Sequence, residues 1–381
     1  MLDRVLEPRI MSHLFEKANA QHIPLSGAFE ISPLCNMDCR MCYVKMNKEE
    51  MQGKGKLRTM EEWLSLAEEA KKQGLLYILL TGGEPFLSKD FKDLYLRLGS
   101  MGFVLSINSN GTMIGEEEVN WLKEAPPMRL NITLYGASNE TYARLCRNAK
   151  GFDQVTRAVV MLKEAGISVK LNASMTPYNI DDMEKMYQFA EEHGVKIKMT
   201  SYMFPPLRRD KNAIGKNARF TAEEAGYHMA VFDSHMYERE HFLVRAEQMR
   251  RGELQEPCDE RAMDEGECMM CRAGRSTFWV TWDGRMPICG MMNEPAAYPF
   301  EQGFSEAWEQ LGRATEAIRL PRACAGCKSA GACINCAAMS YTETGEVSKR
   351  PDYLCKMTEA YIAETLKLAD DMLDKRKGQN E

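Results

Sequence analysis

The chain has 381 residues, of which 44% are hydrophobic, and its formal net charge is −6. This length accommodates one large domain plus a smaller one, and the negative charge argues against non-specific nucleic-acid binding, which needs a basic surface. The N-terminal segment is polar and has no uninterrupted apolar core, so the sequence predicts neither a signal peptide nor a membrane span. We therefore expect a cytoplasmic location.

Residues 1–27 are predicted to form an N-terminal helical extension. Thr59 and Glu62 have the spacing of a helix-opening capping box, and Gly74 marks the end of that helix. Short apolar or β-branched runs that predict buried parallel strands cover residues 28–33, 76–83, 103–111, 129–136, 168–176 and 196–204. Six β/α units in series predict an α/β fold over residues 28–204, a partial (β/α)6 TIM-type barrel. Chemistry is then expected at the C-terminal ends of the strands.

The pattern changes after residue 204. Residues 205–257 are predicted to be a helical linker region, 258–356 a small cysteine-rich domain, and 357–381 a C-terminal helix and tail. The basic residues between 208 and 219 favour a solvated loop over a site for an acidic peptide. No motif marks a catalytic residue; Asp210 and Asp283 lie in loops near the predicted barrel mouth.

The cysteines are the unusual feature of this composition. The chain has 13 of them, and without a secretion signal they indicate metal binding rather than disulfides. Cys35, Cys39 and Cys42 follow the first strand as C-x3-C-x2-C. Three thiolates can hold three irons of a [4Fe–4S] cluster and leave the fourth iron open. Zinc is the alternative, but structural zinc sites normally have four ligands and this loop supplies three.

This loop, followed by Tyr43, resembles the signature loop of the radical S-adenosylmethionine (SAM) superfamily. Gly82-Gly83-Glu84 at the end of the second strand resembles the GGE motif of that family, and the end of the third strand resembles its TNG turn. The resemblance implies that SAM is cleaved reductively to a 5′-deoxyadenosyl radical, which abstracts a hydrogen atom from the substrate. The residues that it implies for SAM binding are Tyr43, Gly82, Gly83, Glu84, Asn108, Asn110, Thr133 and Arg144.

In the C-terminal region, Cys271 is followed by Gly284 and Cys289, and later by a C-x2-C-x5-C-x2-C run from Cys324 to Cys336 and a lone Cys355. This pattern resembles a SPASM domain, which holds two auxiliary [4Fe–4S] clusters. The gap before Cys336 is one residue shorter than in the family pattern. The resemblance implies that one auxiliary cluster is bound by Cys271, Cys289, Cys336 and either Cys268 or Cys258. It implies that the other is bound by Cys324, Cys327, Cys333 and Cys355. The expected cofactors are therefore three [4Fe–4S] clusters and SAM.

The resemblance favours crosslinking or oxidation of a ribosomally made peptide, with a flavodoxin- or ferredoxin-type electron donor. About 27 residues precede the first strand, too few for a fused leader-binding domain, so we expect direct peptide recognition or a separate leader-binding protein.

Three alternatives to this function stay open. Formylglycine maturation of sulfatases is less favoured, because Thr133-Leu134-Tyr135-Gly136 stands where sulfatase-maturing relatives have Ser-Leu-Asp-Gly. Dehydrogenation or epimerisation of a small molecule is the second. A protein without catalytic activity, either an electron carrier or a zinc-held interaction module, is the third.

Overall fold

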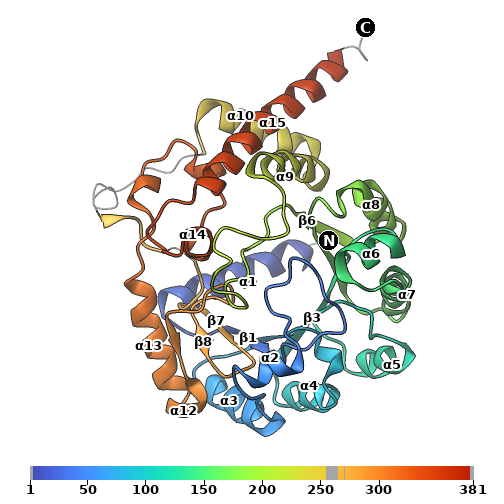
Figure 1. Ribbon diagram of the computed structural model, residues 1–381, viewed down its shortest axis with the longest axis vertical. Helices are drawn as coiled ribbons and strands as arrows, with labels where there is room; N and C mark the ends of the chain where they lie inside the picture. Colours follow the sequence, from blue (N-terminus) through green and yellow to red (C-terminus); the bar gives the residue numbers. More distant parts are fainter. Residues whose placement is uncertain (1–2, 255–264, 270, 378–381) are drawn as a thin grey trace.

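A curved parallel sheet organises the chain (Figure 1). This computed structural model describes residues 3–254, 265–269 and 271–377, without the side chains of residues 3–9 and 375–377. The strand order is β6-β5-β4-β3-β2-β1-β7. The first six strands lie within or overlap the six predicted runs: β1 Ser26–Glu30, β2 Tyr77–Thr81, β3 Val104–Ser109, β4 Arg129–Thr133, β5 Val169–Ser174 and β6 Lys196–Thr200. The predicted partial barrel is therefore confirmed.

The seventh strand was not predicted. β7, Thr277–Val280, pairs in parallel with β1 and lies in the cysteine-rich region. The ring of Phe278 lies so close to Gly27 that a Cβ there would sit 2.4 Å from it. Four residues are too few to give a recognisable periodic pattern. The sheet therefore continues past the proposed barrel boundary at residue 204 into the region proposed as a separate domain.

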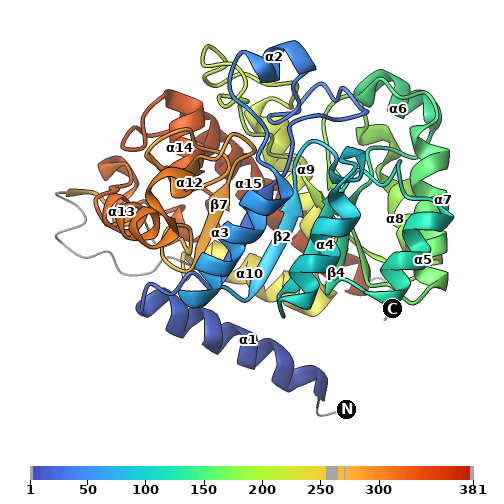
Figure 2. The same cartoon turned by 90° about the horizontal axis from the view of Figure 1, so that it is seen from below.

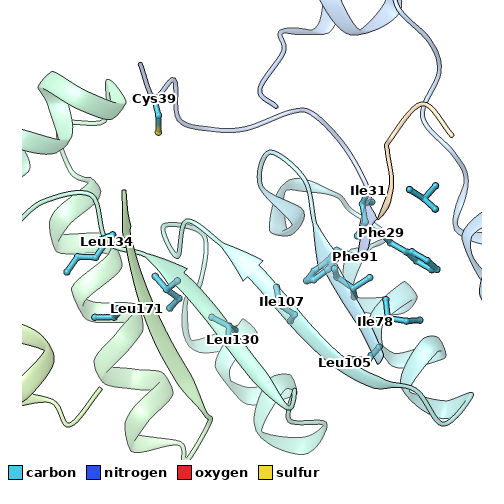
Figure 3. Close-up of a cluster of buried hydrophobic side chains, with 14 of the residues drawn as sticks. Phe29, Ile31, Cys39, Ile78, Phe91, Leu105, Ile107, Leu130, Leu134 and Leu171 are labelled. Carbon is cyan, nitrogen blue, oxygen red and sulfur yellow. The ribbon is translucent and has the colours of Figure 1, made fainter. Parts of the chain in front are cut away.

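Helices cover the outer face of the sheet (Figure 1). In α3, the Thr59 hydroxyl accepts from the Glu62 N–H, and the Glu62 carboxylate accepts from the Thr59 N–H, so the predicted capping box is confirmed. Phe29 stacks on Trp63 of α3 with ring centroids 5.0 Å apart, and Figure 3 shows further apolar side chains of this core. The covering helices are α3 Met60–Lys72, α4 Phe91–Ser100, α5 Glu116–Glu124, α7 Gly151–Glu164 and α8 Met183–Glu192.

The remaining elements close the ends of the barrel. The N-terminal helix α1, Asp3–Ala20, crosses beneath the sheet (Figure 2), and its Phe15 stacks on Tyr77 at 6.0 Å. The long helix α15 packs along α9 beside β6. Within the described ranges, no helix combines the length and apolar character that a bilayer crossing requires. The other elements are α2 Lys48–Gln52, α6 Asn139–Cys146, α9 Ala222–Met236, α10 Arg239–Arg251, β8 Met286–Pro287, β9 Ala296–Ala297, α12 Pro299–Gln302, α13 Phe304–Glu316, α14 Ala337–Thr344 and α15 Asp352–Lys377.

Candidate cofactor and substrate site

Three thiols of the loop after β1 converge at the C-terminal ends of the strands. Cys35 Sγ accepts from the Met37 N–H at 3.4 Å, and Cys42 Sγ accepts from the Lys45 N–H at 3.3 Å. The pKa of Cys35 is raised to about 12, mainly by burial and in addition by the charges of Glu84, Cys39 and Cys42. Three thiolates crowded in a buried loop repel one another, so they need a bound cation to ionise together. The donor set therefore fits an iron–sulfur cluster held by three thiolates.

The two glycines at the end of β2 allow the cysteine loop to pass close to the backbone. A Cβ on Gly82, whose φ is +152°, would lie 2.4 Å from the Ser32 carbonyl oxygen. A Cβ on Gly83 would lie 2.3 Å from the Leu34 oxygen. Instead, Gly83 N–H donates to the Ser32 oxygen at 2.7 Å. Both glycines are therefore required by the segment that leads into Cys35; their contact with SAM stays a prediction.

Glu84 is fully engaged inside the protein. Its carboxylate accepts from the Ser109 hydroxyl at 2.9 Å, the Asn110 N–H at 2.7 Å and the Phe86 N–H at 3.2 Å. Burial raises the pKa of Glu84 to about 7, although these hydrogen bonds oppose the shift. The side chain thus ties the end of β2 to the end of β3, beneath the cysteine loop.

Asn110 also supports the cysteine loop. Its Nδ2 donates to Asn36 Oδ1 at 2.9 Å and lies 3.6 Å from Cys35 Sγ. Its Oδ1 accepts from the Thr112 N–H and hydroxyl. Asn110 is therefore placed to orient a thiol as well as to meet a ligand.

The other predicted SAM residues are spread around the barrel mouth and lumen. Asn108 accepts from the Asn131 amide at 2.9 Å, across the pair β3 and β4. Thr133 lies at the end of β4 on the same face of the sheet, two residues beyond Asn131. The Arg144 guanidinium donates to the Tyr178 carbonyl oxygen at 2.6 and 3.1 Å.

Tyr43 lies between the first cysteine loop and the C-terminal region. Burial raises its pKa, and the charges that act on its hydroxyl are those of Arg208, Glu30, Cys42 and Cys289. Thus Tyr43 is close both to a predicted ligand of the SAM-binding cluster and to a predicted auxiliary ligand.

The predicted auxiliary ligands form two groups. Burial raises the pKa of Cys289 to about 11, and Cys336 and Cys271 raise it further. Cys336 is therefore placed beside the other two, although its spacing is one residue short. The three thiols form one side of a site; their role as cluster ligands stays a prediction.

The second group contains the remaining four thiols. Burial raises the pKa of Cys324 to about 11, and Cys355, Cys333 and Cys327 contribute in that order. Cys327 is exposed, and the other three are partly buried. The lone cysteine of α15 therefore reaches the turn-rich segment more than 20 residues upstream, as the predicted ligand set requires.

The fourth ligand of the first auxiliary group stays open. Cys268 is exposed on a backbone bridge to Arg319, and Cys258 lies outside the described residues. Within the described part of the chain, no three His, Cys, Asp or Glu side chains are close enough to bind a single metal ion. An iron–sulfur cluster is larger than a single ion, so it holds its thiolates farther apart.

A buried ion pair joins the barrel to the C-terminal region. Arg208 donates to both carboxylate oxygens of Glu30 at 2.7 and 2.8 Å, and to the Gly290 carbonyl oxygen. The Trp279 indole of β7 also donates to Glu30. Sequence reasoning missed this network, although a glutamate that ends a buried strand is a visible signal.

Arg219, in the same basic stretch as Arg208, pairs with Glu343 and is nearly buried. The predicted solvated loop is therefore wrong for these two arginines.

A cavity of about 680 Å³ lies above these groups, with Arg208 in its wall. Its walls come from the 207–214 loop, the α2 region and the segment 282–301. Asp283 lines it and is held by Arg285 at 2.8 Å. Arg209, also in the wall, is close enough to Cys42 to lower the pKa of its thiol, which burial raises. The volume is within the range of small-molecule sites, and Met46, four residues after Cys42, is part of its wall.

Comparisons with known proteins agree with this arrangement. The family model for the radical SAM superfamily matches residues 29–190. The AdoMet-dependent heme synthase of Methanosarcina barkeri is 22% identical over 86% of this chain and 95% of its own length. The sporulation killing factor maturation protein SkfB of Bacillus subtilis is 27% identical over 46% of this chain and 42% of its own length.

The fold also matches solved structures. Streptococcus suis SuiB, bound to precursor peptide SuiA, aligns with a TM-score of 0.65 at 16% identity and covers 93% of this chain and 81% of that protein. At this identity the match concerns the fold alone. The matched domain includes the three-cysteine loop, the GGE turn and the first five strands, and its fold implies bound SAM and one [4Fe–4S] cluster. Residues 29–190 are therefore a radical SAM domain, and the chain is an enzyme.

Proposed function

We propose that this enzyme modifies a ribosomally made peptide and carries two auxiliary clusters in a SPASM-type C-terminal region. The observation that carries the proposal is the position of the cavity, which is lined by Met46, four residues after Cys42, and by residues 282–301 of the C-terminal region. A substrate in this cavity would lie against both parts of the chain. When bound, the first cluster supplies the electron that cleaves SAM, and the resulting deoxyadenosyl radical takes a hydrogen atom from the substrate.

Residues of the chain have two tasks in this reaction. Cys35, Cys39 and Cys42 hold the cluster, while Glu84 and Asn110 fix the loop that presents them. The cavity walls orient the substrate and exclude water, which is an alternative hydrogen source for a radical.

The two thiol groups of the C-terminal region are proposed to hold the auxiliary clusters. Cys271, Cys289 and Cys336, with Cys268 or Cys258, would bind the cluster nearer the cavity. Cys324, Cys327, Cys333 and Cys355 would bind the second cluster, which a flavodoxin- or ferredoxin-type donor could reach beside the exposed Cys327. Both would serve to remove or deliver single electrons.

A peptide substrate is supported by the relatives and by the wall of the cavity. SkfB is named as a maturation protein, and SuiB was solved with its precursor peptide. Lys54, Arg209 and Lys211 line the cavity together with Glu294 and Glu301, so it offers charged groups of both signs to a peptide. A separate leader-binding protein stays part of this proposal.

A small molecule is the second candidate substrate, and one observation favours it. Two relatives that align over most of both chains are named as heme synthases, whereas the match to SkfB covers less than half of each chain. A tetrapyrrole is therefore the small-molecule class to test.

The test is anaerobic reconstitution followed by iron analysis and an assay for 5′-deoxyadenosine from SAM and dithionite. We expect about twelve irons per chain, since each [4Fe–4S] cluster holds four, and deoxyadenosine formation. Replacing Cys324 and Cys327 by alanine should remove about four irons and leave SAM cleavage; loss of all iron or none would contradict the assignment. Product formed from a tetrapyrrole, but from no precursor peptide, would overturn the peptide proposal.

A further inference from the structure

The strands β4, β5 and β6 present two different faces. Leu130 of β4 and Leu171 of β5 belong to the buried core that the helices cover (Figure 3). Successive side chains of a strand point to opposite sides, so the residues that alternate with these leucines lie on the inner face of the barrel. A hydrogen bond of 2.9 Å between Asn131 and Asn108 runs across this inner face. The strand register therefore shows which inner side chains are neighbours.

Polar and basic residues form rows across the inner face. The row nearer the mouth of the barrel is Thr133, Asn172 and Lys198. The next row is two residues deeper and consists of Asn108, Asn131, Lys170 and Lys196. Arg129 lies two residues below Asn131 on β4. A strand rises about 3.3 Å per residue, so the four basic residues lie on the walls of the barrel below the strand ends.

These four basic residues lack an acidic counterpart. Among the residues that the structure describes, none of them forms an ion pair. Lys170 is directly opposite Lys196, and like charges in this position destabilise a sheet. The pKa of Lys170 is lowered, first by burial and then by the charges of Lys198 and Arg129. A surface lined by one sign of charge attracts ligands of the opposite sign.

Two structural roles account for only part of this arrangement. Lysines on β6, the last strand of the sheet, hinder pairing with another chain. The charge of Lys198 also acts on the pKa of Asp233 in α9, although that carboxylate accepts from the Tyr361 hydroxyl at 2.6 Å. Neither role applies to Lys170, because its strand β5 is paired on both sides. A bound anion would supply the missing counter-charge.

We propose that the inner face of β4, β5 and β6 binds carboxylate groups of the substrate, with Lys170 and Lys198 as the residues that pair with them. The inference deepens the proposed function and rests on it, because that function supplies the identity of the bound molecule. The upper row begins at Thr133, a predicted SAM residue, so a substrate that reacts at the mouth would extend its carboxylates into the barrel. A peptide would supply acidic side chains, and a tetrapyrrole its peripheral carboxylates.

The test is the Lys170→Gln variant of the whole enzyme, reconstituted anaerobically. Two probes carry carboxylates from the two sources: an end-blocked peptide of alternating glutamate and glycine, and protoporphyrin IX. Their uncharged counterparts are the glutamine peptide and the porphyrin dimethyl ester. Equilibrium dialysis should show that the wild type binds one carboxylate probe at least about tenfold more tightly than its counterpart, and that Lys170→Gln loses this preference, because a hydrogen bond to a charged group contributes about a factor of ten or more. The probe that binds identifies the source of the carboxylate.

Lys123→Gln is the matched control. Lys123 is exposed on the outer helix α5, so the substitution removes the same charge from the protein but not from the inner face. Its affinity for both probes should equal that of the wild type. The proposal is overturned by equal weakening in the two variants, by unchanged affinity in Lys170→Gln, or by a wild type that prefers neither carboxylate probe.

Thermal unfolding separates ligand binding from a structural role. Lys170→Gln removes repulsion from Lys198 and Arg129, so without a probe it should unfold at the same temperature as the wild type or at a higher one. A lower melting temperature would mean that Lys170 stabilises the sheet and would overturn the proposal. Lys198→Gln, at an exposed position, should weaken binding in the same way.

Failure of the proposed function gives a different result. If the wild type forms no 5′-deoxyadenosine from SAM, the proposed function is refuted whatever the probes do. If deoxyadenosine forms but probe binding does not depend on Lys170, only the inference about the inner face is refuted.

Discussion

The close approach at Gly83 gives a direct test of how the cysteine loop is held. In Gly83→Ala the new Cβ would lie 2.3 Å from the Leu34 oxygen and 2.7 Å from the Pro33 oxygen. These are backbone atoms, so the chain must move rather than a side chain. Overpacking of this kind costs about 1–3 kcal/mol. The two hydrogen bonds from the N–H groups of residues 83 and 84 to the loop add about 1 kcal/mol each if they are lost.

If both hydrogen bonds are lost, the expected loss in the free energy of unfolding is therefore about 3–5 kcal/mol. It is measured by urea denaturation of cluster-free protein, followed by tryptophan fluorescence, and iron content after reconstitution is measured in parallel. The first cluster should be retained poorly, because the displaced segment leads directly into Cys35.

Gly99→Ala is the control for this substitution. Gly99 lies within α4, and a Cβ there would meet only Leu105 Cδ1, at 3.9 Å. Alanine in a helix is favoured over glycine, so the control should be more stable by about 0.5–1 kcal/mol. If Gly83→Ala stays within about 0.5 kcal/mol of the wild type and keeps its iron, the reasoning about the loop is refuted.

Three further predictions concern buried groups. Arg208→Ala leaves Glu30 buried without its partner and should cost about 3–5 kcal/mol in urea denaturation; a cost below about 1 kcal/mol would mean that the pair is not formed. Burial raises the pKa of Glu84 to about 7, so its contribution to stability is complete below the unfolded pKa near 4.5 and is lost as the pH rises to 7. The free-energy difference between wild type and Glu84→Gln should therefore fall by about 3 kcal/mol over this range, and a constant difference would contradict the burial argument. Trp63→Ala removes the ring that stacks on Phe29 and should cost about 3–5 kcal/mol, with Trp63→Phe losing clearly less; equal losses would exclude ring packing as the cause.

Local patterns in the sequence were sufficient for the repeating β/α units. The apolar runs and the Thr59 capping box depend on residues a few positions apart, and they predicted six strands and the helices between them. Because parallel strands end at one edge, the cysteine loop and the Gly82-Gly83 turn were expected together, and the structure places them in contact.

Groups of thiols could be assigned only through resemblance to a family. The spacing of the C-terminal cysteines does not by itself say which of them meet, because turns between them can fold in several ways. The structure brings Cys336 to Cys271 and Cys289 despite its shortened spacing. It also brings Cys355 to the turn-rich segment that contains Cys324.

The sequence alone thus determined the barrel, the cysteine loop and the position of the motifs at the strand ends, since each is encoded within one β/α unit. Tertiary structure alone decided that β7 extends the sheet and that Arg208 pairs with Glu30. These contacts join residues about 180 to 250 positions apart in the chain. No local periodicity reports such contacts, because they depend on how the finished elements pack.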